Sequence, residues 1–362
     1  MRHRIILIAR KLTRIFFMVA GFSVLGFLLF LFTVSLTSYN PEKEIILTNL
    51  PQAPVFSSDT VEILTWNIGY AGLGREMDFF YDGGKQTRTG KAKTLENLDS
   101  IASLTEFRTA DFVLFQEVDK NSRRTYGIDE VSAIARQMPD YAAVYATNYS
   151  VLFVPVPLSS PLGHVESGIM TMCRYMPSQS LRYSYPSKQS WLKKLFLPRR
   201  CIILCHIPLK NGSQLVLINT HNSAFDSNGE QRNEEMSFLK TVAVNEYKNG
   251  NYVIIGGDWN QIPPLKNTLK YRDIKTEYFA PFTILPDFIP DEWSWASDGN
   301  PTNRFLDMPY VENHTKETLI DFFLISPNIE ILSVKCINKK YKHSDHNPVI
   351  GKFLLKNMNI NK

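Results

Sequence analysis

The sequence predicts an α/β domain in which two packed β-sheets are flanked by helices, preceded by one membrane-spanning helix. Short apolar runs rich in β-branched and aromatic residues recur between residues 60 and 355, as expected for buried strands. Helix-like stretches separate only some of these runs, which favours two packed sheets in one domain. An uncharged run of 27 residues, from Ile15 to Pro41, predicts the spanning helix, because about 20 apolar residues cross a bilayer.

The composition is that of a folded protein. Of the 362 residues, 44% are hydrophobic and 21% are charged, which excludes a disordered, collagen-like or disulfide-scaffold chain. The net charge of +5 belongs to the N-terminal tail: five of the 40 Lys and Arg residues precede residue 15, and the other 35 equal the 35 Asp and Glu residues. The body is therefore neutral in bulk, which does not favour a polyanion-binding domain.

The N-terminal region divides into a basic tail (1–14), a membrane anchor (15–36) and a linker (37–59) rich in Pro, Ser, Thr and Asn. Positive charges before the span, with none directly after it, predict a single-pass plasma-membrane protein. Its N-terminus would stay in the cytoplasm and the rest of the chain, after the span, would lie outside the cytoplasm. A cleavable signal peptide, cut near residues 35–38, and a buried core helix are the alternatives.

The predicted domain covers residues 60–358. Its strands are expected at 61–66, 111–116, 167–173, 201–207, 215–220, 252–257, 319–325 and 347–353, and its helices at 93–107, 129–137 and 230–248. The last helix has Met236, Leu239 and Ala243 on one face and ends before Gly250, a typical C-cap. The four cysteines show no zinc-like spacing.

Polar side chains stand at or near the ends of several buried strands. They are Asn67, Glu117, His221, Asp258, Asn260, Asp321, Asp345 and His346. Strand ends at one edge of a sheet converge, so these groups are expected around one pocket. Oxygen ligands without cysteine suit Mg²⁺, with Mn²⁺ as the alternative.

Six motifs carry a family resemblance. They are WNI (66–68), QEV (116–118), NTH (219–221), GDWN (257–260), IDFFLIS (320–326) and SDHNPV (344–349). In this order they resemble the endonuclease/exonuclease/phosphatase superfamily, which includes DNase I-like nucleases, abasic-site endonucleases, neutral sphingomyelinases and inositol polyphosphate 5-phosphatases. The resemblance covers residues 60–355.

The resemblance implies a four-layered α/β sandwich and divalent-metal-dependent hydrolysis of phosphate esters. Glu117 matches the main metal-binding carboxylate of the family. Asn67 and Asp345 match groups near the ion, either as direct ligands or through water.

The resemblance also implies catalytic roles. His346 matches the general base and Asp321 the carboxylate that orients it. Asp258 and Asn260 match the pair that positions the attacking water and the phosphate, and His221 matches the donor to the phosphate. Histidine titrates near neutral pH, and nothing in the sequence resembles an activated covalent nucleophile, so direct in-line attack by water is expected.

The sequence leaves the substrate open between a phospholipid or sphingolipid head group and nucleic acid. The segment HNSAFD (221–226) is similar to sphingomyelinases, and a tether beside a bilayer favours lipids slightly. Alternatives are an extracytoplasmic DNase I-like nuclease and a non-catalytic anchored binding protein.

Segments 77–88, 185–200 and 287–298 are expected near the substrate or packed on the body, and Arg174 is expected near the site. The bilayer is an expected partner, and no protein partner is implied.

Overall fold

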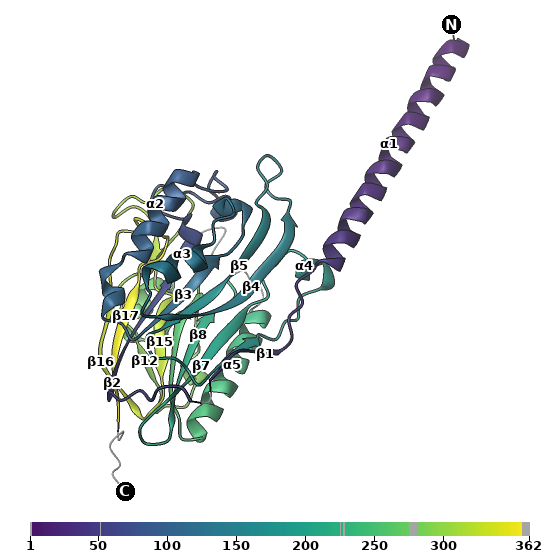
Figure 1. Cartoon of the computed structure of the whole chain (residues 1–362). Coiled ribbons are helices and arrows are strands. Elements are labelled where there is room, and N and C mark those ends of the chain that lie inside the picture. Colours follow the sequence, from purple (N-terminus) through teal and green to yellow (C-terminus); the bar gives the residue numbers. More distant parts are fainter. Residues whose placement is uncertain (1, 51, 225, 227–228, 275–280, 357–362) are drawn as a thin grey trace.

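The domain consists of a six-stranded and a seven-stranded β-sheet packed face to face, with helices on both outer faces (Figure 1). The computed structural model describes residues 2–50, 52–224, 226, 229–274 and 281–356. The predicted fold class is confirmed. The last two residues of the predicted domain, 357 and 358, lie outside the described residues.

The six-stranded sheet has the order β16-β17-β2-β3-β5-β4. Its strands are β2 (Thr60–Asn67), β3 (Phe112–Asp119), β4 (Ala142–Val154), β5 (Gly163–Cys173), β16 (Ile329–Cys336) and β17 (Val349–Leu355). Only β2 and β3 are parallel neighbours, and the chain between them contains helix α2 (Lys91–Ala102). The other neighbours in this sheet are antiparallel.

The seven-stranded sheet has the order β1-β6-β7-β8-β9-β15-β12. Its strands are β1 (Glu44–Asn49), β6 (Gln179–Ser184), β7 (Cys201–Pro208), β8 (Gln214–His221), β9 (Tyr252–Asp258), β12 (Ser294–Ala296) and β15 (Asp321–Ile325). Here β8 and β9 are the parallel pair, and helix α5 (Glu230–Lys248) lies between them in the chain. Two small pairs, β10 (Gln261–Ile262) with β11 (Phe282–Thr283) and β13 (Asn303–Arg304) with β14 (Glu317–Thr318), lie outside the main sheets.

Each sheet therefore has one parallel strand pair with a helix in the connection, and this arrangement builds four layers. Helices α2 and α3 (Glu130–Gln137) pack on the outside of the six-stranded sheet, through a core that includes Leu98, Ile134 and Phe115. Helix α5 packs on the outside of the other sheet through Leu239 and neighbours. The predicted helix 93–107 is shorter in the structure, since α2 ends at Ala102 and a 3₁₀ turn follows.

The space between the two sheets is filled by apolar side chains from both. They include Ile63, Phe112, Ile203, Leu217, Ile254, Phe323 and Phe353, each with no exposed surface. Central strands covered on both faces appear as continuous apolar runs in the sequence, which is why these strands were predictable. Cys173, Cys201, Cys205 and Cys336 are buried free thiols.

The predicted linker is wrong over part of its length. Residues 44–49 form β1, which pairs antiparallel with β6, and Phe56 is fully buried and bridges to Leu209. β1 is an edge strand with alternating exposed positions, so it lacks the continuous apolar run of a central strand. Residues 44–49 and Phe56 are therefore part of the folded domain.

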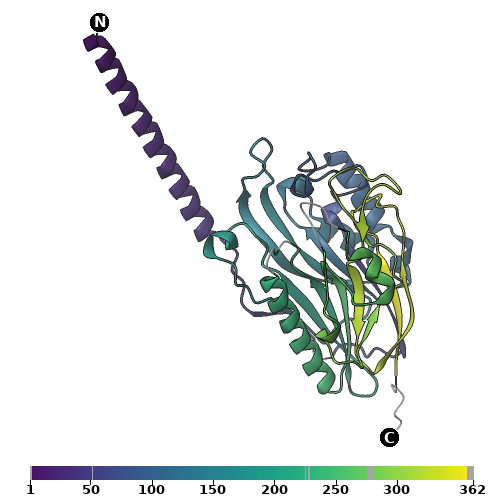
Figure 2. The same cartoon turned by 180° about the vertical axis from the view of Figure 1, so that it is seen from behind.

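The long helix α1 (Arg2–Leu36) projects from the domain (Figures 1 and 2). By length and composition alone, Arg4–Leu36 is long and apolar enough to cross a membrane, and its most apolar stretch is not buried in the protein. The buried-core-helix alternative is therefore wrong. Near its end, Phe30 contacts Phe153 and Phe196 with ring centroids 6.3 Å apart in each pair, and Val34 is buried.

Both parallel pairs end at the same edge of the sandwich. Asn67 is the last residue of β2 and lies opposite Gln116 of β3, while His221 and Asp258 end β8 and β9. In both views β17 ends at the end of the domain away from the free end of α1 (Figures 1 and 2). The start of β17, next to His346, therefore faces the side toward which α1 extends.

Candidate active site

Three neighbouring strands present a row of polar side chains at this edge. His221 of β8 pairs with Asp258 of β9, and Asp258 pairs with Asp321 of β15. Side chains of paired residues lie on the same face of a sheet, so the register alone places the three groups side by side. Gly257 allows the ends of β8 and β9 to lie this close together, since a Cβ at residue 257 would lie 2.0 Å from the carbonyl oxygen of Thr220.

The facing sheet contributes Asn67 and Glu117. The register of β3 shifts between Phe115 and Val118, and Glu117 has a φ of 54°, in the left-handed region. A bulge re-aims the side chain of its extra residue, and strained backbone of this kind concentrates at functional sites. Asn67 closes the gap between the sheets, because its Nδ2 donates to Oδ2 of Asp258 at 2.9 Å.

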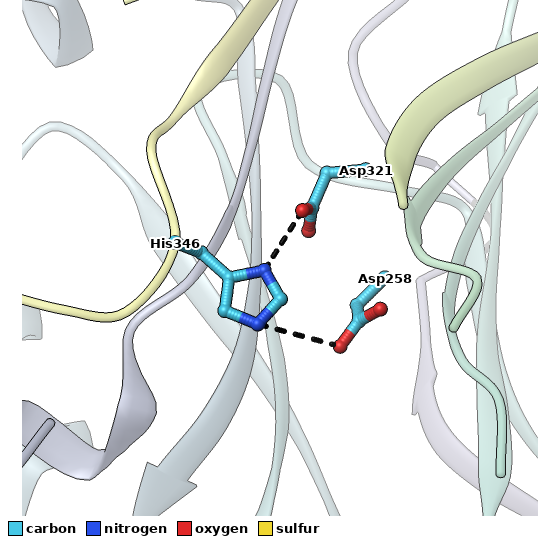
Figure 3. Close-up of side chains that lie close together, drawn as sticks. All are labelled: Asp258, Asp321 and His346. Carbon is cyan, nitrogen blue, oxygen red and sulfur yellow. Dashed lines mark hydrogen bonds and ion pairs between the residues drawn. The ribbon is translucent and has the colours of Figure 1, made fainter. Parts of the chain in front are cut away.

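His346 and Asp321 form a buried pair (Figure 3). Nδ1 of His346 lies 2.8 Å from Oδ2 of Asp321, and Nε2 lies 3.9 Å from Oδ2 of Asp258 and from Oδ2 of Asp345. A carboxylate only accepts hydrogen bonds, so the proton on Nδ1 points to Asp321. The lone pair of the neutral ring then lies on Nε2, on the side of the other two carboxylates.

The loop that carries His346 is held by several hydrogen bonds. Ser344 Oγ donates to the carbonyl of Asn67 at 2.8 Å and accepts from the backbone N–H of His346 at 3.1 Å. Trp66 Nε1 donates to the carbonyl of His346 at 2.9 Å, and the backbone N–H of Arg304 donates to the carbonyl of Asp345 at 3.0 Å. The positions of the ring and of the adjacent carboxylate are thus fixed from two sides.

Asp258 stands at the centre of the network. Its Oδ1 accepts from the backbone N–H of Asn260 at 2.9 Å, and the Asn260 side chain donates to the carbonyl of Asn222 at 2.9 Å. Asn260 has a φ of 50°, a conformation that asparagine tolerates better than most residues. The GDWN turn therefore holds an amide and a carboxylate together at the end of β9.

His221 is oriented by a cation. Arg200 Nη1 lies 2.6 Å from Nδ1 of His221, while Nε2 lies 3.4 Å from Oδ2 of Asp258 and 3.7 Å from Oε1 of Glu117. Guanidinium groups only donate, so Nδ1 accepts and Nε2 carries the proton. Burial, with Arg200 and His346 adding to it, lowers the pKa of His221 well below its usual value. His221 is therefore a neutral ring with one fixed N–H donor.

The remaining titratable groups are strongly perturbed. Burial opposes the positive charge on His346, but Asp321, Asp345 and Asp258 outweigh it and raise the pKa of the ring to about 10. Burial raises the pKa of Asp258 to about 7, with His346 opposing and Asp321 adding to the shift. Burial raises the pKa of Asp345 to about 6, with Glu117 adding to it. Such shifts are typical of active sites.

The residues of this edge fit a divalent cation. Burial raises the pKa of Asp82 to about 7, and Asp345 and Glu117 add to that shift, so three carboxylates crowd one region. Glu117 keeps 25% of its side chain exposed, which leaves this region open to solvent. Hard oxygen donors in excess are the donor set that Mg²⁺ prefers.

A second group of potential ligand atoms lies beside the first. One ligand atom from each of Asp258, Asp321 and His346 lies within 4.8 Å of the other two. These side chains already bind one another or their neighbours, although Oδ1 of Asp321 is buried without a hydrogen-bond partner. The crowded carboxylates of Glu117 and Asp345 therefore fit the cation better.

The structure brings eight of the nine predicted site residues into this network. The exception is Arg174, which directly follows β5. The last residue of β5, Cys173, pairs with Phe112 at the start of β3, so Arg174 lies at the end of the sheet opposite to the catalytic edge. Arg174 is exposed and donates to the carbonyl of Arg108 and to the hydroxyl of Tyr141. The prediction that it lies near the site is wrong.

Sequence reasoning missed several supporting residues. Gln116 Nε2 donates to Oδ1 of Asn219 at 2.8 Å, and Asn219 Nδ2 donates to the carbonyl of Phe115 at 3.2 Å, which joins the two sheets beneath the site. Both residues stand inside the quoted motifs, so motif membership was the available signal. Arg200 and Asp82 stand outside the motifs and had no such signal.

The three segments expected near the substrate or packed on the body have different locations in the structure. Segment 77–88 contributes Asp82 to the site. In segment 287–298, Trp293 is buried and Trp295 packs on Trp259 with ring centroids 5.6 Å apart, so this segment is packed on the body. Segment 185–200 includes the short helix α4 (Trp191–Lys194), where Trp191 is 59% exposed.

Comparisons with known proteins agree with this architecture. The model of the Endonuclease/Exonuclease/phosphatase family matches residues 64–346. The solved structure of an endonuclease/exonuclease/phosphatase from Beutenbergia cavernae DSM 12333 is 15% identical, with 83% of this chain and 73% of that chain covered and a TM-score of 0.58.

Two further structures share the fold. ANGEL2, described as a 2',3'-cyclic phosphatase, is 13% identical, with 82% of this chain and 95% of that chain covered and a TM-score of 0.53. TDP2 from D. rerio, complexed with a single-strand DNA product, is 13% identical, with 82% of this chain and 99% of that chain covered and a TM-score of 0.51. The comparison with curated proteins found no match.

Members of the matched family are phosphodiesterases, nucleases and phosphatases, and they generally use divalent metal ions. The match contains five of the six sequence motifs and the sixth as far as His346, while β1 and β17 lie outside it. The chain belongs to the endonuclease/exonuclease/phosphatase family of phosphoester hydrolases.

Proposed function

We propose that this protein is a membrane-anchored, Mg²⁺-dependent phosphodiesterase that hydrolyses phospholipid or sphingolipid head groups. The observation that carries the proposal is the buried His346–Asp321 pair, whose Nε2 faces Asp258 and Asp345. This is the arrangement of a general base with its orienting carboxylate. The site assignments that follow are part of the proposal.

In the proposed reaction, water attacks the phosphorus atom in line with the leaving group, and the bond from phosphorus to the leaving alcohol oxygen breaks as the new P–O bond forms. The leaving oxygen takes a proton from solvent. Nε2 of His346 takes the proton of the water, and Asp321 stabilises the imidazolium that forms. Asp258 and Asn260 hold the water and a phosphate oxygen. The fixed N–H of His221 donates to an oxygen on which negative charge builds up.

Glu117 and Asp345, with Asn67 near them, hold the divalent cation in this proposal. When bound, the cation neutralises charge on the phosphate and the leaving oxygen and opposes the positive charge on His346, so that the ring releases its proton nearer neutral pH. Gly69 supports the position of Asp345, because a Cβ there would lie 2.7 Å from its Oδ1.

The placement of α1 supports a substrate at a membrane surface. The catalytic edge faces the side toward which α1 extends, so an anchored domain would present the site to the bilayer (Figure 1). Exposed apolar side chains of α4, Trp191 and Leu192, stand beside the end of this helix, and Leu158 at the β4–β5 turn is 88% exposed. Exposed aromatic and aliphatic groups of this kind suit a membrane interface.

Nucleic acid is the second candidate substrate. D. rerio TDP2, which shares the fold, was solved with a single-strand DNA product. The neutral body charge disfavours it, since nucleic-acid binding depends mainly on basic side chains that contact phosphates.

The test offers the full chain in detergent micelles with Mg²⁺ two substrates in parallel: sphingomyelin with phosphatidylcholine in mixed micelles, and plasmid DNA. The His346→Ala variant is the blank. Head-group phosphate release that the blank lacks is the expected result. Nicking of DNA alone would replace the lipid substrate with nucleic acid, and absence of turnover on both would favour an anchored binding protein.

We further propose that residues 15–36 span the plasma membrane, with residues 1–14 in the cytoplasm and the domain outside it. The basic tail and the exposed apolar surface of α1 support this topology.

A further inference from the structure

We propose that a pocket beside the catalytic edge binds the head-group phosphate of an anionic phospholipid. The pocket has a volume of about 610 Å³ and lies between the segment that follows α1, the segment around α4, and helix α5. Its lining includes Asn40, Lys43, Lys194, Arg199, Arg200 and Glu235. This inference rests on the proposed membrane topology and goes beyond the proposed hydrolysis.

The cations of this pocket form no close ion pair with the described carboxylates. Among the residues that the structure describes, no carboxylate lies within ion-pair distance of Lys43, Lys194, Arg199 or Arg200. By contrast, Lys188 in the same segment pairs with Glu234 at 2.7 Å. Unpaired cations gathered at one pocket are arranged to meet an anion that comes from outside the chain.

Arg199 is the clearest case. Its Nε is buried without a hydrogen-bond partner, and burial lowers the pKa of its guanidinium, with no acidic group opposing the shift. A buried, unpaired donor on a charged group costs free energy, and a phosphate oxygen would satisfy it.

The lining holds four basic and two acidic side chains, and of the acidic ones, Glu44 and Glu235, the second is already satisfied. Oε1 and Oε2 of Glu235 accept from the hydroxyl and the backbone N–H of Ser223 at 2.6 and 2.8 Å, and Gln231 Nε2 donates to Oε1 at 3.0 Å. Glu235 therefore does not take up the cations of the lining, and the pocket keeps a positive excess.

The position of the pocket selects a lipid as the source of the phosphate. Asn40 follows the end of α1 by four residues, so it lies within roughly 14 Å of Leu36 even if this stretch is fully extended. The packing of Phe30 on Phe196 brings the α4 segment alongside the last turns of α1. The pocket is thus held at the level of the lipid head groups, which begin directly outside the hydrocarbon layer.

Arg200 connects this pocket to the catalytic edge. It lines the pocket and also donates to Nδ1 of His221. A phosphate bound in the pocket would hold the guanidinium in place and with it the orientation of the histidine ring.

The test measures lipid binding in the His346→Ala full chain, so that lipid turnover cannot affect the result. Protein is released from micelles that contain equal amounts of phosphatidylglycerol and phosphatidylcholine, and bound lipid is counted by native mass spectrometry. Lys194→Gln and Arg199→Gln remove cations of the pocket. Lys193→Gln is the matched control. It removes the same charge at the position next to Lys194, but the Lys193 side chain does not line the pocket.

We expect one phosphatidylglycerol to be retained in preference to phosphatidylcholine. Each pocket variant should weaken this retention about fivefold, the effect of one basic side chain at an anionic membrane surface, and Lys193→Gln should leave it unchanged. Equal loss in Lys193→Gln, or no preference for phosphatidylglycerol, would overturn the proposal. Displacement of the lipid by equimolar inorganic phosphate would assign the pocket to free phosphate and overturn the lipid assignment. Because this test measures lipid binding and not turnover, failure here leaves the hydrolase proposal untouched.

Discussion

At the scale of single residues, Asp321 has the most specific role in the proposed mechanism, since it fixes the proton of His346 on Nδ1. Asp321→Asn keeps the shape of the side chain but removes its charge and allows the wrong ring tautomer. We expect kcat to fall about 10³–10⁴-fold, as for the equivalent change in a serine-protease triad. A double variant with His346→Ala should be no slower than His346→Ala alone, because the two residues act as one unit. Strictly multiplicative losses would contradict this coupling.

Glu117 gives a prediction that does not depend on turnover. If its carboxylate binds Mg²⁺, the ion stabilises the folded wild type, and saturating Mg²⁺ should raise its Tm. Glu117→Gln should lose most of this increase, while Glu330→Gln, an exposed change on β16, should keep it. EDTA should reverse the increase. An equal Tm response in Glu117→Gln would show that the ion binds elsewhere.

The sequence predicts the residues that act on the substrate better than those that hold them. His346, Asp258 and Glu117 are recognisable because chemistry restricts which residue types can do their work. Arg200 comes from a basic segment outside the six motifs, and only the fold brings it to His221. Arg174 was misplaced because its position after a strand does not say which end of the sheet that strand reaches.

At the scale of elements, the two parallel pairs depend on a hydrogen-bonded connection between the sheets. Gln116 Nε2 donates to Thr65, to the carbonyl of Leu114 and to Asn219, all within the core. Gln116→Leu would leave the buried Oδ1 of Asn219 without this donor. We expect the free energy of unfolding in urea to fall by about 1–3 kcal/mol, with a reduced kcat because the catalytic strands shift.

The control for this change is Gln137→Leu at the exposed end of α3, which should alter stability by less than about 0.5 kcal/mol. Gln116→Leu combined with Asn219→Leu should destabilise less than the sum of the single changes, since the two side chains share one bond. Additive losses would mean that the pair does not connect the sheets.

The central strands were predictable and several outer ones were not, for a physical reason. Strands β2, β3, β8, β9 and β15 are covered on both faces, so each contains a continuous run of buried residues that is mostly apolar. Strands β1, β4 and β16 lie at sheet edges and alternate between buried and exposed positions. The polar composition of the β1 region therefore suggested a linker.

At the scale of the whole molecule, the topology of the chain determines which substrates the site can meet. The four native cysteines are buried, so a new exposed cysteine can report its side of the membrane. Lys210→Cys, in the exposed turn between β7 and β8, should react with a membrane-impermeant maleimide on intact cells. Arg4→Cys should react only after permeabilisation. Labelling in the reverse order would place the domain in the cytoplasm.

The central claim is that His346 activates water for attack on a phosphate ester. The most direct measurement is the steady-state rate of bis(4-nitrophenyl) phosphate hydrolysis by the full chain with Mg²⁺. It compares the wild type with His346→Ala and with His343→Ala, a nearby histidine that contacts Asn97 instead. We expect a loss of at least about 10³-fold for His346→Ala and a change below about twofold for His343→Ala. Near-wild-type turnover by His346→Ala, or equal losses in both variants, would contradict the claim.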